Sequence, residues 1–300
     1  MIKKLKKFVS DSSWRFGILN YLGLLKFLDD ESYIKKEYYY KMGKILDLDN
    51  PQSFNEKLQW LKIHDRKEIY TFMVDKAAVK DYIGEMLGRE YLIPTIGIWD
   101  NADDIDFSIL PQQFVLKCTH NSGGVIICRN KSSFNIEDAK KSLNKSIKRN
   151  YYYEHREWVY KDVPHRIIAE KYMSNPDEKS LMDYKFYCFN GKPLFLYVSV
   201  GLENHKNARI SFFDMEWNVT AFGRSDYKPL KDIPPKPKNF NEMVSIAKRL
   251  SQNIPFVRVD LYEIRGKIYF SELTFCPCAG MMFFEPPEAD LEIGKMLELR

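Results

Sequence analysis

The chain has 300 residues, of which 45% are hydrophobic and 29% are charged, the balance of a soluble globular protein with ample material for a large core. This length predicts one large domain or two to three closely packed subdomains. A net charge of +5 favours anionic ligands, such as nucleotides, sugar acids or a phospholipid surface, and gives no reason to expect nucleic acid.

The five cysteines and five histidines lack the spacing of a zinc site. No CxxC pair is present, and Cys276-Pro277-Cys278 is too tight for a zinc knuckle. An odd number of cysteines without regular spacing predicts reduced thiols and a cytoplasmic chain. No serine lies in a nucleophile elbow, so a Ser-His-Asp triad is not expected.

Four lysines near the N-terminus, Lys3, Lys4, Lys6 and Lys7, precede an interrupted apolar run over residues 16–25. This run lacks the clean apolar core and cleavage site of a secretory signal, and it is too short to span a bilayer. Two interpretations remain, a first amphipathic helix packed on the domain or a helix lying on an anionic membrane surface. The second would bring the protein into peripheral contact with the inner membrane surface.

The pattern of apolar residues among charges predicts helices between residues 53 and 87, and Ser53 with Glu56 has the spacing of a capping box. Further along, β-branched and aromatic runs predict strands. In chain order, we expect strands at 92–96, 114–117 and 125–128, a helix at 135–148, strands at 166–170, 183–190 and 193–200, and a helix at 242–250. This order predicts a mixed α and β fold (α+β) with largely antiparallel sheets.

A loop with serine and two glycines, Cys118 to Gly124, joins two of these strands. Its backbone N–H groups could bind an anion, and Lys117 just before it adds a positive charge suited to a phosphate. It is not a Walker A loop, because GxxxxGK[ST] is absent, and a plain β-hairpin fits the same residues. Lys76 and Lys80, on a predicted helix, are each interpreted as solvated charges.

Residues 256–275 predict two strands joined by a turn at Arg265-Gly266-Lys267. With that three-residue loop, Ile264 faces Ile268, Asp260 faces Glu272 and Arg258 faces Thr274. Two carboxylates directly opposed across strands repel each other, and a cation between them removes the repulsion. Magnesium, which prefers oxygen ligands and is usually shared with phosphates, is the natural candidate. An exposed hairpin with both acids in water is the alternative.

Two further acidic features allow more than one interpretation. Asp104-Ile105-Asp106 matches the DxD pattern by which sugar-nucleotide glycosyltransferases hold a metal, although a solvated loop is the simpler explanation. Asp183 and Lys185 lie on one face of a predicted strand, where they could form an ion pair or, through the lysine, contact a phosphate.

Taken in order, several segments resemble the ATP-grasp superfamily, and most closely its TupA-like branch of polysaccharide-biosynthesis proteins. The segments are FNEKLQWLKIHDR from Phe54, VDKAAVKDYI from Val74, FVLKCTHNSGG from Phe114, REWVY from Arg156, IIAEKYM from Ile167, DYKFYCFNGKP from Asp183, and VRVDLY with IYFSELTF near the C-terminus. The resemblance runs from about residue 54 to the C-terminus.

The resemblance implies an ATP-grasp fold, with the nucleotide held between two largely antiparallel sheets. We place an N-terminal helical and α/β subdomain at residues 1–110 and a lid subdomain with the glycine-rich loop at 111–173. The C-terminal subdomain, which carries the metal-binding hairpin, then spans 174–300.

The resemblance also implies roles for individual residues. Nucleotide contacts fall on Lys76, Lys117, the loop residues His120, Ser122, Gly123 and Gly124, the adenine-binding hinge Glu170, Lys171 and Met173, and Asp177 at the ribose. Lys185 would lie near the γ-phosphate, and Arg258 would stabilise the charged intermediate. Asp260, Glu272 and Thr274 would bind Mg²⁺. Many relatives have Glu-x-Asn where this chain has Glu272-Leu273-Thr274, which puts a second Mg²⁺ in question.

The implied reaction is an ATP-dependent ligation in which a carboxylate becomes an acylphosphate and an amine then forms an amide. In polysaccharide biosynthesis the carboxylate would be a uronic acid of a capsule or cell-wall precursor, and the amine an amino acid or small amino alcohol. The alternative is a glycosyltransferase that uses Asp104 and Asp106, and a third is a relative that binds a nucleotide or glycan without catalysis.

Overall fold

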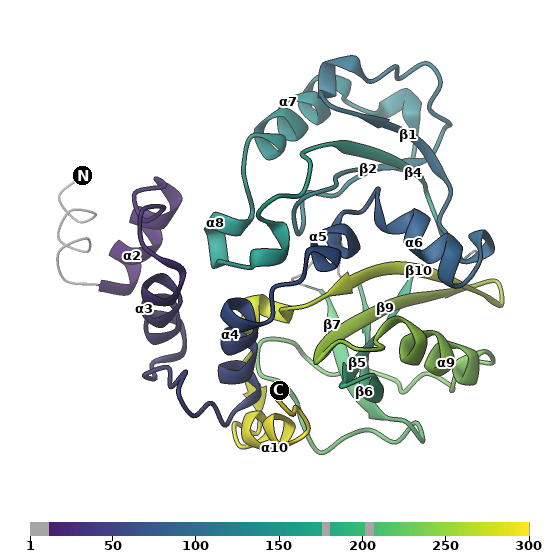
Figure 1. The fold of residues 1–300 in the computed structure, drawn as a ribbon. Coiled ribbons are helices and arrows are strands. Elements are labelled where there is room, and N and C mark those ends of the chain that lie inside the picture. The colour runs from purple at the N-terminus through teal and green to yellow at the C-terminus, as the bar shows by residue number, and fades with distance from the viewer. Residues whose placement is uncertain (1–11, 176–180, 202–206, 300) are drawn as a thin grey trace.

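The computed structural model describes residues 12–175, 181–201 and 207–299. Two antiparallel sheets dominate it (Figure 1). The smaller has the order β1 (Thr95–Trp99), β4 (Ile167–Lys171), β2 (Phe114–Cys118) and β3 (Ile126–Cys128). The larger has the order β10 (Lys267–Thr274), β9 (Phe256–Ile264), β5 (Met182–Phe189), β6 (Lys192–Val200) and β7 (Arg209–Asp214). A short pair joins β11 (Phe284–Glu285) to β8 (Gly223–Arg224). The predicted mixed fold with antiparallel sheets is confirmed.

The helices lie between the sheets, on the outer faces of both sheets and along one side of the molecule (Figure 1). In chain order they are α2 (Ser12–Tyr21), α3 (Asp30–Met42), α4 (Phe54–His64), α5 (Glu68–Val74), α6 (Val79–Met86), α7 (Ile136–Ile147), α8 (Tyr152–His155), α9 (Phe240–Leu250) and α10 (Ala289–Lys295). Short 3₁₀ turns are η1 (Arg89–Tyr91), η2 (Ala102–Asp104), η3 (Lys131–Ser133), η4 (Trp158–Tyr160) and η5 (Pro277–Gly280). None of the helices in the described ranges is both long and apolar enough to cross a membrane.

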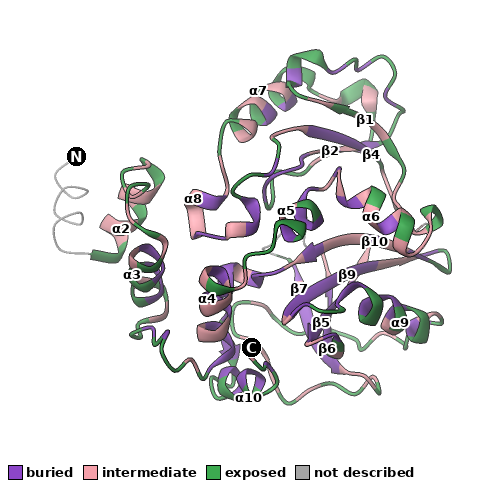
Figure 2. Cartoon of the chain, viewed as in Figure 1, coloured by how far each residue is buried: buried purple, intermediate pink, exposed green. Residues whose placement is uncertain are grey.

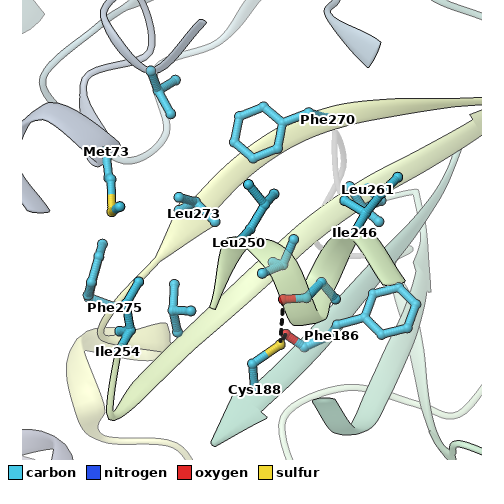
Figure 3. Packing of buried hydrophobic residues seen from close by; sticks show 14 of the residues in the cluster. Met73, Phe186, Cys188, Ile246, Leu250, Ile254, Leu261, Phe270, Leu273 and Phe275 are labelled. Carbon is cyan, nitrogen blue, oxygen red and sulfur yellow. Dashed lines mark hydrogen bonds between the residues drawn. The ribbon is translucent and has the colours of Figure 1, made fainter. Parts of the chain in front are cut away.

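The largest core cluster surrounds the β9–β10 hairpin. Figure 3 shows Met73 of α5 on one side of the hairpin, with Ile246 and Leu250 of α9 packed near Leu261 and Phe186. All five side chains are at most 5% exposed. The hairpin is therefore held between α5 and α9, so that the ends of its strands have a fixed position relative to the neighbouring elements.

The start of α4 has the predicted capping box. Ser53 Oγ accepts a hydrogen bond from the backbone N–H of Glu56 at 3.2 Å, and Glu56 Oε2 accepts from the N–H of Ser53 at 2.9 Å. These two bonds satisfy N–H groups that a helix start leaves without intrahelical partners, so the helix begins at Phe54.

The register of the β9–β10 hairpin differs from the prediction at its turn. The turn has two residues, Arg265 at φ +53° and Gly266 at φ +70°, the left-handed pair that tight antiparallel turns require. Lys267 therefore pairs with Ile264, and the predicted pair of Ile264 with Ile268 is wrong.

An irregularity between Phe270 and Glu272 then shifts the hairpin register by one residue. Asp260 consequently does face Glu272, as predicted, and Arg258 faces Thr274. A bulge of this kind adds one residue to one strand, which compensates for the residue that the shorter turn removed.

Strand β1 begins at Thr95, later than the strand predicted at 92–96, because Leu92 instead forms a parallel bridge to Phe270 of the larger sheet. Strand β1 pairs with β4, which joins residues from before position 110 to the smaller sheet. The subdomain boundaries at residues 110 and 173 stay a prediction.

Candidate functional site

Glu170 on β4 holds two lysines from different elements. Its Oε1 lies 2.5 Å from Lys80 Nζ on α6, and its Oε2 lies 2.5 Å from Lys117 Nζ on β2. Val115 pairs with Glu170, so Lys117, two residues along the same strand, points to the same face of the sheet. Burial alone raises the pKa of Glu170, but the two ammonium groups outweigh it and hold that pKa below its usual value.

Lys80 is not the solvated charge that its position on a helix predicted. Its side chain is 14% exposed, and its ammonium also donates to the carbonyl oxygen of Ile93 at 2.6 Å. The pKa of Lys80 is lowered, chiefly by burial. Sequence reasoning missed this residue, because a lysine on a predicted helix gives no local sign of the carboxylate that pairs with it from a distant strand.

Lys76 precedes α6 and is tied to the glycine-rich loop. Its ammonium donates to the carbonyl oxygen of Asn121, and its backbone N–H donates to Thr119 O at 3.2 Å. Burial lowers the pKa of Lys76, and the positive charge of Lys117 lowers it further, while Glu272 in the other sheet raises it. These mutual effects on pKa link lysines beside the smaller sheet with a carboxylate of the larger sheet.

The glycine-rich loop has a buried base and an exposed tip. His120 is fully buried, its ring stacked on His165 with centroids 3.8 Å apart, and its Nε2 lies 3.0 Å from Arg149 O. Burial and the neighbouring His165 lower the pKa of His120 to about 4, so its ring is neutral at pH 7. Ser122, Gly123 and Gly124 are exposed, and both glycines have left-handed φ values of +81° and +67°. The tip can therefore approach a ligand, whereas the imidazole anchors the loop from inside.

Asp260 on β9 is the most tightly bound acid of the larger sheet. It is fully buried and pairs across the sheet with Lys185 of β5, whose Nζ lies 2.6 Å from its Oδ2. Arg258 binds the same carboxylate with two donors, Nε to Oδ1 at 2.7 Å and Nη2 to Oδ2 at 2.6 Å. Lys185 Nζ is also 3.6 Å from Asp183 Oδ1, so these two residues do lie on one face. Burial alone lowers the pKa of Lys185, but Asp183 and Asp260 raise it well above its usual value.

Glu272 on β10 is more open than Asp260. Its side chain is 40% exposed, and its ion pair with Arg258 is long, 3.4 Å from Oε1 to Nη2. The same guanidinium donates to Thr274 Oγ1 at 3.0 Å. Partial burial raises the pKa of Glu272, but nearby positive charges, chiefly Lys185 and Lys76, hold it at about 2. Glu272 is therefore ionised at every physiological pH, with oxygen surface free to meet a cation.

Of the three predicted magnesium ligands, Glu272 has the open carboxylate, whereas Asp260 is fully buried and bonded to Arg258 and Lys185, so a metal at Asp260 would have to displace one of these cations. Asp260, Glu272 and Thr274 supply two carboxylates and a hydroxyl, the oxygen chemistry that Mg²⁺ prefers. Among the described residues, including those of this site, no three His, Cys, Asp or Glu side chains lie close enough together to hold a metal by themselves. Mg²⁺ is usually bound by one or two carboxylates, with waters and substrate phosphates as its remaining ligands.

Other predicted site residues are less informative. The backbone N–H of Lys171 donates to Pro94 O at 3.0 Å, and Met173, half-buried, lies two residues beyond the end of β4. Asp177 lies outside the described residues. One further pair was missed by sequence reasoning: Asp75, directly before Lys76, is 2% exposed and lies 2.7 Å from Arg166 Nη2.

Asp104 and Asp106, the alternative metal ligands, are engaged within their own loop. Asn101 Nδ2 donates to Asp104 Oδ2 at 3.1 Å, and Asp106 Oδ1 accepts from both the N–H and the hydroxyl of Ser108, at 2.8 and 2.5 Å. These local bonds are those of a solvated turn.

Comparisons with solved structures find several ATP-grasp ligases. D-alanine–D-alanine ligase from Helicobacter pylori is 14% identical over 83% of this chain and 70% of its own, with a TM-score of 0.41. The enzyme from Bacillus anthracis, complexed with ATP, is 16% identical over 88% and 82%, with a TM-score of 0.41. The ligase PsnB, complexed with Mg and ADP, is 8% identical over 79% and 60%, with a TM-score of 0.38. Similarities this weak carry no argument about activity.

No curated protein matches the chain. The model of one protein family, described as TupA-like ATPgrasp, matches residues 56–298. This range takes in both sheets, the lysines around Glu170 and the hairpin with Asp260 and Glu272. The resemblance drawn from the sequence is thereby confirmed, together with the prediction of an ATP-grasp ligase at the level of the family. The chain belongs to the TupA-like ATP-grasp family.

Proposed function

We propose that this protein is an ATP-dependent carboxylate–amine ligase. The observation that carries the proposal is the open carboxylate of Glu272, which lies 3.4 Å from Arg258 Nη2 and whose pKa is held at about 2 by the positive charges of Lys185, Lys76, Arg258 and Lys117. Four cations near one ionised acid form a site suited to a polyphosphate with its metal. The family match is the reason to expect that this polyphosphate is ATP.

The proposed roles divide between the two sheets. Beside the smaller sheet, Lys76 and Lys117 bind nucleotide phosphates and the tip Ser122 to Gly124 closes over them. The hinge Glu170, Lys171 and Met173 contacts adenine, mainly through its backbone, since the Glu170 carboxylate already holds two lysines. Asp177 is proposed at the ribose, and His120 supports the loop from inside.

On the larger sheet, Asp260 and Glu272, with Thr274, would hold Mg²⁺, which neutralises phosphate charge when bound. Lys185 reaches the γ-phosphate by exchanging part of its contact with Asp260, and Arg258 stabilises the charge of the intermediate. Positioning and charge neutralisation are then the protein's main contributions.

The proposed reaction has two steps. A carboxylate oxygen attacks the γ-phosphorus of ATP, the bond between that phosphorus and the bridging oxygen breaks, and ADP leaves. A neutral amine then attacks the carbonyl carbon of the acylphosphate, phosphate leaves with the bonding pair, and the nitrogen loses a proton to give an amide. Because the reaction needs ATP, we propose a cytoplasmic location.

For the substrates, we propose a uronic acid of a capsule or cell-wall polysaccharide precursor and an amino acid or small amine. The support is the family resemblance together with the net charge of +5, which favours an anionic precursor. A metal-dependent glycosyltransferase has less support, since Asp104 and Asp106 are bonded within their own loop.

The function is tested by incubating the protein with ATP, Mg²⁺, a panel of uronic acids and a panel of amines while following ADP. We expect ADP release that requires one acid and one amine together, and an amide of the corresponding mass. Nucleotide binding measured by calorimetry in the same samples separates the alternatives. Binding of UDP-sugars without binding of ATP would overturn the ligase proposal, and ATP binding without turnover with any pair would favour a non-catalytic relative.

A further inference from the structure

The segment between α2 and α3 presents apolar side chains to solvent. In residues 21–28, Leu22 is 61% exposed, Leu24 58% and Phe27 96%. Figure 2 shows this part of the chain largely exposed at the edge of the molecule. When large apolar side chains are exposed close together on a soluble domain, they indicate a surface that is covered by a membrane or by another molecule.

This segment is an ordered turn. Backbone hydrogen bonds run from Leu24 N to Leu19 O at 2.9 Å and from Leu28 N to Leu25 O at 3.2 Å. Gly23, at φ +72°, takes the left-handed conformation that ends α2. Leu25 and Leu28 pack inward on a core cluster with Tyr33, which leaves the intervening Leu24 and Phe27 outside.

A buried arginine fixes the turn in place. Arg156 is 1% exposed, and its Nη2 donates to the carbonyl oxygens of Leu25, Lys26 and Leu28 at 2.9, 3.3 and 3.1 Å. Its guanidinium also lies over the Tyr33 ring, 4.6 Å from the centroid. Burying a guanidinium away from water destabilises the fold unless its N–H groups are hydrogen-bonded. Here the partners of those N–H groups are the carbonyl oxygens of this turn. The apolar side chains are therefore held outward by the core itself.

Most of the net charge of the chain falls in the N-terminal part of the sequence, which carries this turn. Residues 1–48 contain ten lysines and arginines against six acids, a net charge of +4, whereas residues 49–300 contain 36 against 35, a net charge of +1. Nine of the ten basic residues are lysines, of which Lys35, Lys36, Lys41 and Lys44 are exposed on or just after α3. Tyr21 and Tyr39, 77% and 52% exposed, add rings with a polar tip, the kind that lie at membrane interfaces.

The acids next to the turn have local partners, and Glu31 lies 2.6 Å from Lys35 Nζ on α3. Asp29 caps α3 by accepting from Ser32 N at 2.8 Å, and Asp30 lies 2.6 Å from Arg66 Nη2. Apolar side chains at the tip with lysines around them are typical of peripheral membrane contacts, because the apolar groups insert and the lysines meet anionic headgroups. Interfaces between proteins are instead depleted in lysine.

We propose that the α2–α3 turn, called here the apolar turn (residues 21–28), inserts Leu22, Leu24 and Phe27 into an anionic lipid bilayer. The exposed lysines on or just after α3, Lys35, Lys36, Lys41 and Lys44, bind the headgroups. This goes beyond the ligase proposal and does not depend on it, since the turn shares none of its residues with the nucleotide site.

The test is co-sedimentation of the full chain with vesicles of phosphatidylcholine alone or with about one third phosphatidylglycerol. We expect binding to the anionic vesicles that weakens when salt is raised from about 0.05 to about 0.5 M, because the Debye length shortens. Changing Leu22, Leu24 and Phe27 together to serine should lower the partition coefficient about tenfold or more, from lost apolar burial. Changing Lys35, Lys36, Lys41 and Lys44 together to glutamine should weaken binding and reduce its salt dependence.

The matched control changes three exposed apolar residues elsewhere, Val219, Ile233 and Leu291 (49%, 63% and 50% exposed), to serine and should leave binding unchanged. Both serine variants should keep the wild-type melting temperature. Absence of wild-type binding, or an equal loss in the control, would refute the proposal. Lipid-free dimers that the Leu22, Leu24 and Phe27 variant abolishes would show instead that a second copy covers the turn.

Discussion

The site contains two carboxylates that each bind two cations, and they differ in where those cations come from. Asp260 is paired by Lys185, its direct neighbour across β5 and β9, and by Arg258 on its own strand. Glu170 is paired by Lys117 on the adjacent strand and by Lys80 on helix α6. The first cluster is built within one sheet, whereas the second requires a helix to dock on a sheet.

The two clusters also differ in exposure. Asp260 is fully buried, and its two cations have side chains 7% and 9% exposed, whereas the lysines of Glu170 are 14% and 16% exposed. Removing one member of a fully buried ion pair costs more stability than removing one from a pair with some access to water, because the remaining charge is left without solvation. The larger sheet should therefore behave as a stable frame for the chemistry, and the smaller sheet as the adjustable side of the site.

The largest effect is expected from Asp260→Asn. It leaves Lys185 and Arg258 with a neutral amide, so we expect a loss of about 3–5 kcal/mol in the free energy of unfolding and no Mg²⁺-dependent ADP formation. Urea denaturation and the coupled assay measure the two quantities. Glu272→Gln is the matched control: it should also abolish ADP formation but cost little stability, because Glu272 is 40% exposed. Equal destabilisation by the two variants would contradict the distinction between a frame residue and an open ligand.

A pH effect should come from His120, beside the smaller sheet. Its pKa is about 4 in the folded protein, below the value near 6.5 of the unfolded chain. The unfolded state binds the proton more readily between these values, so stability falls as pH is lowered from about 6.5 to about 4, by at most about 3 kcal/mol. His120→Gln should flatten this part of the profile when unfolding is followed at several pH values. An unchanged slope would mean that another group carries the dependence.

Glu170→Gln should have a smaller effect than Asp260→Asn. Its lysines keep some access to water, so we expect a loss of about 1–3 kcal/mol in stability. The KM for ATP should rise about tenfold, since the lysines lose their fixed positions. Lys80→Met in the Glu170→Gln background should recover part of the stability, because it removes the more deeply placed of the two unpaired ammonium groups. A greater loss than in Asp260→Asn would reverse the comparison.

The smallest effect on stability is expected from Thr274→Asn, which introduces the amide oxygen that many relatives carry. Thr274 Oγ1 accepts from Arg258, and an asparagine oxygen can accept the same bond, so the free energy of unfolding should change by less than about 1 kcal/mol. The informative readout is the Mg²⁺ concentration that gives half-maximal ADP formation, which should fall if a second ion is bound more tightly. An unchanged Mg²⁺ dependence would indicate that Thr274 does not limit metal binding.

Much of the fold followed from local patterns. The predicted strands at 183–190 and 193–200 correspond to β5 and β6 within one residue at each end, and the helix at 135–148 corresponds to α7. Alternating apolar and aromatic residues with a tight turn between them specify such hairpins locally. Strand β7 was missed, since its run of six residues has no partner turn that a local pattern would reveal.

For the site, the sequence predicted the facing of Asp260 and Glu272 but not how the chain achieves it. The two-residue turn and the compensating bulge are a pair of one-residue changes that cancel, so a wrong turn length still predicted the right pairing. The exposure of Glu272 and the full pairing of Asp260 could not be predicted, because both depend on which side chains arrive from other strands.

The amino-acid sequence by itself determined the antiparallel sheets, the glycine-bearing loop, the acid pair of the hairpin and the family. Each of these features depends on residues that are close together in the sequence or that follow one another in a fixed order. Only the tertiary structure decided that Lys80 joins Glu170, that Lys76 is electrostatically linked to Glu272 in the other sheet, and that Arg156 holds the apolar turn outward. Lys80 and Glu170 are 90 positions apart in the sequence, Lys76 and Glu272 are 196 apart, and Arg156 and Leu25 are 131 apart. No local pattern encodes such pairs, since they form only when helices and sheets pack and bury the charges together.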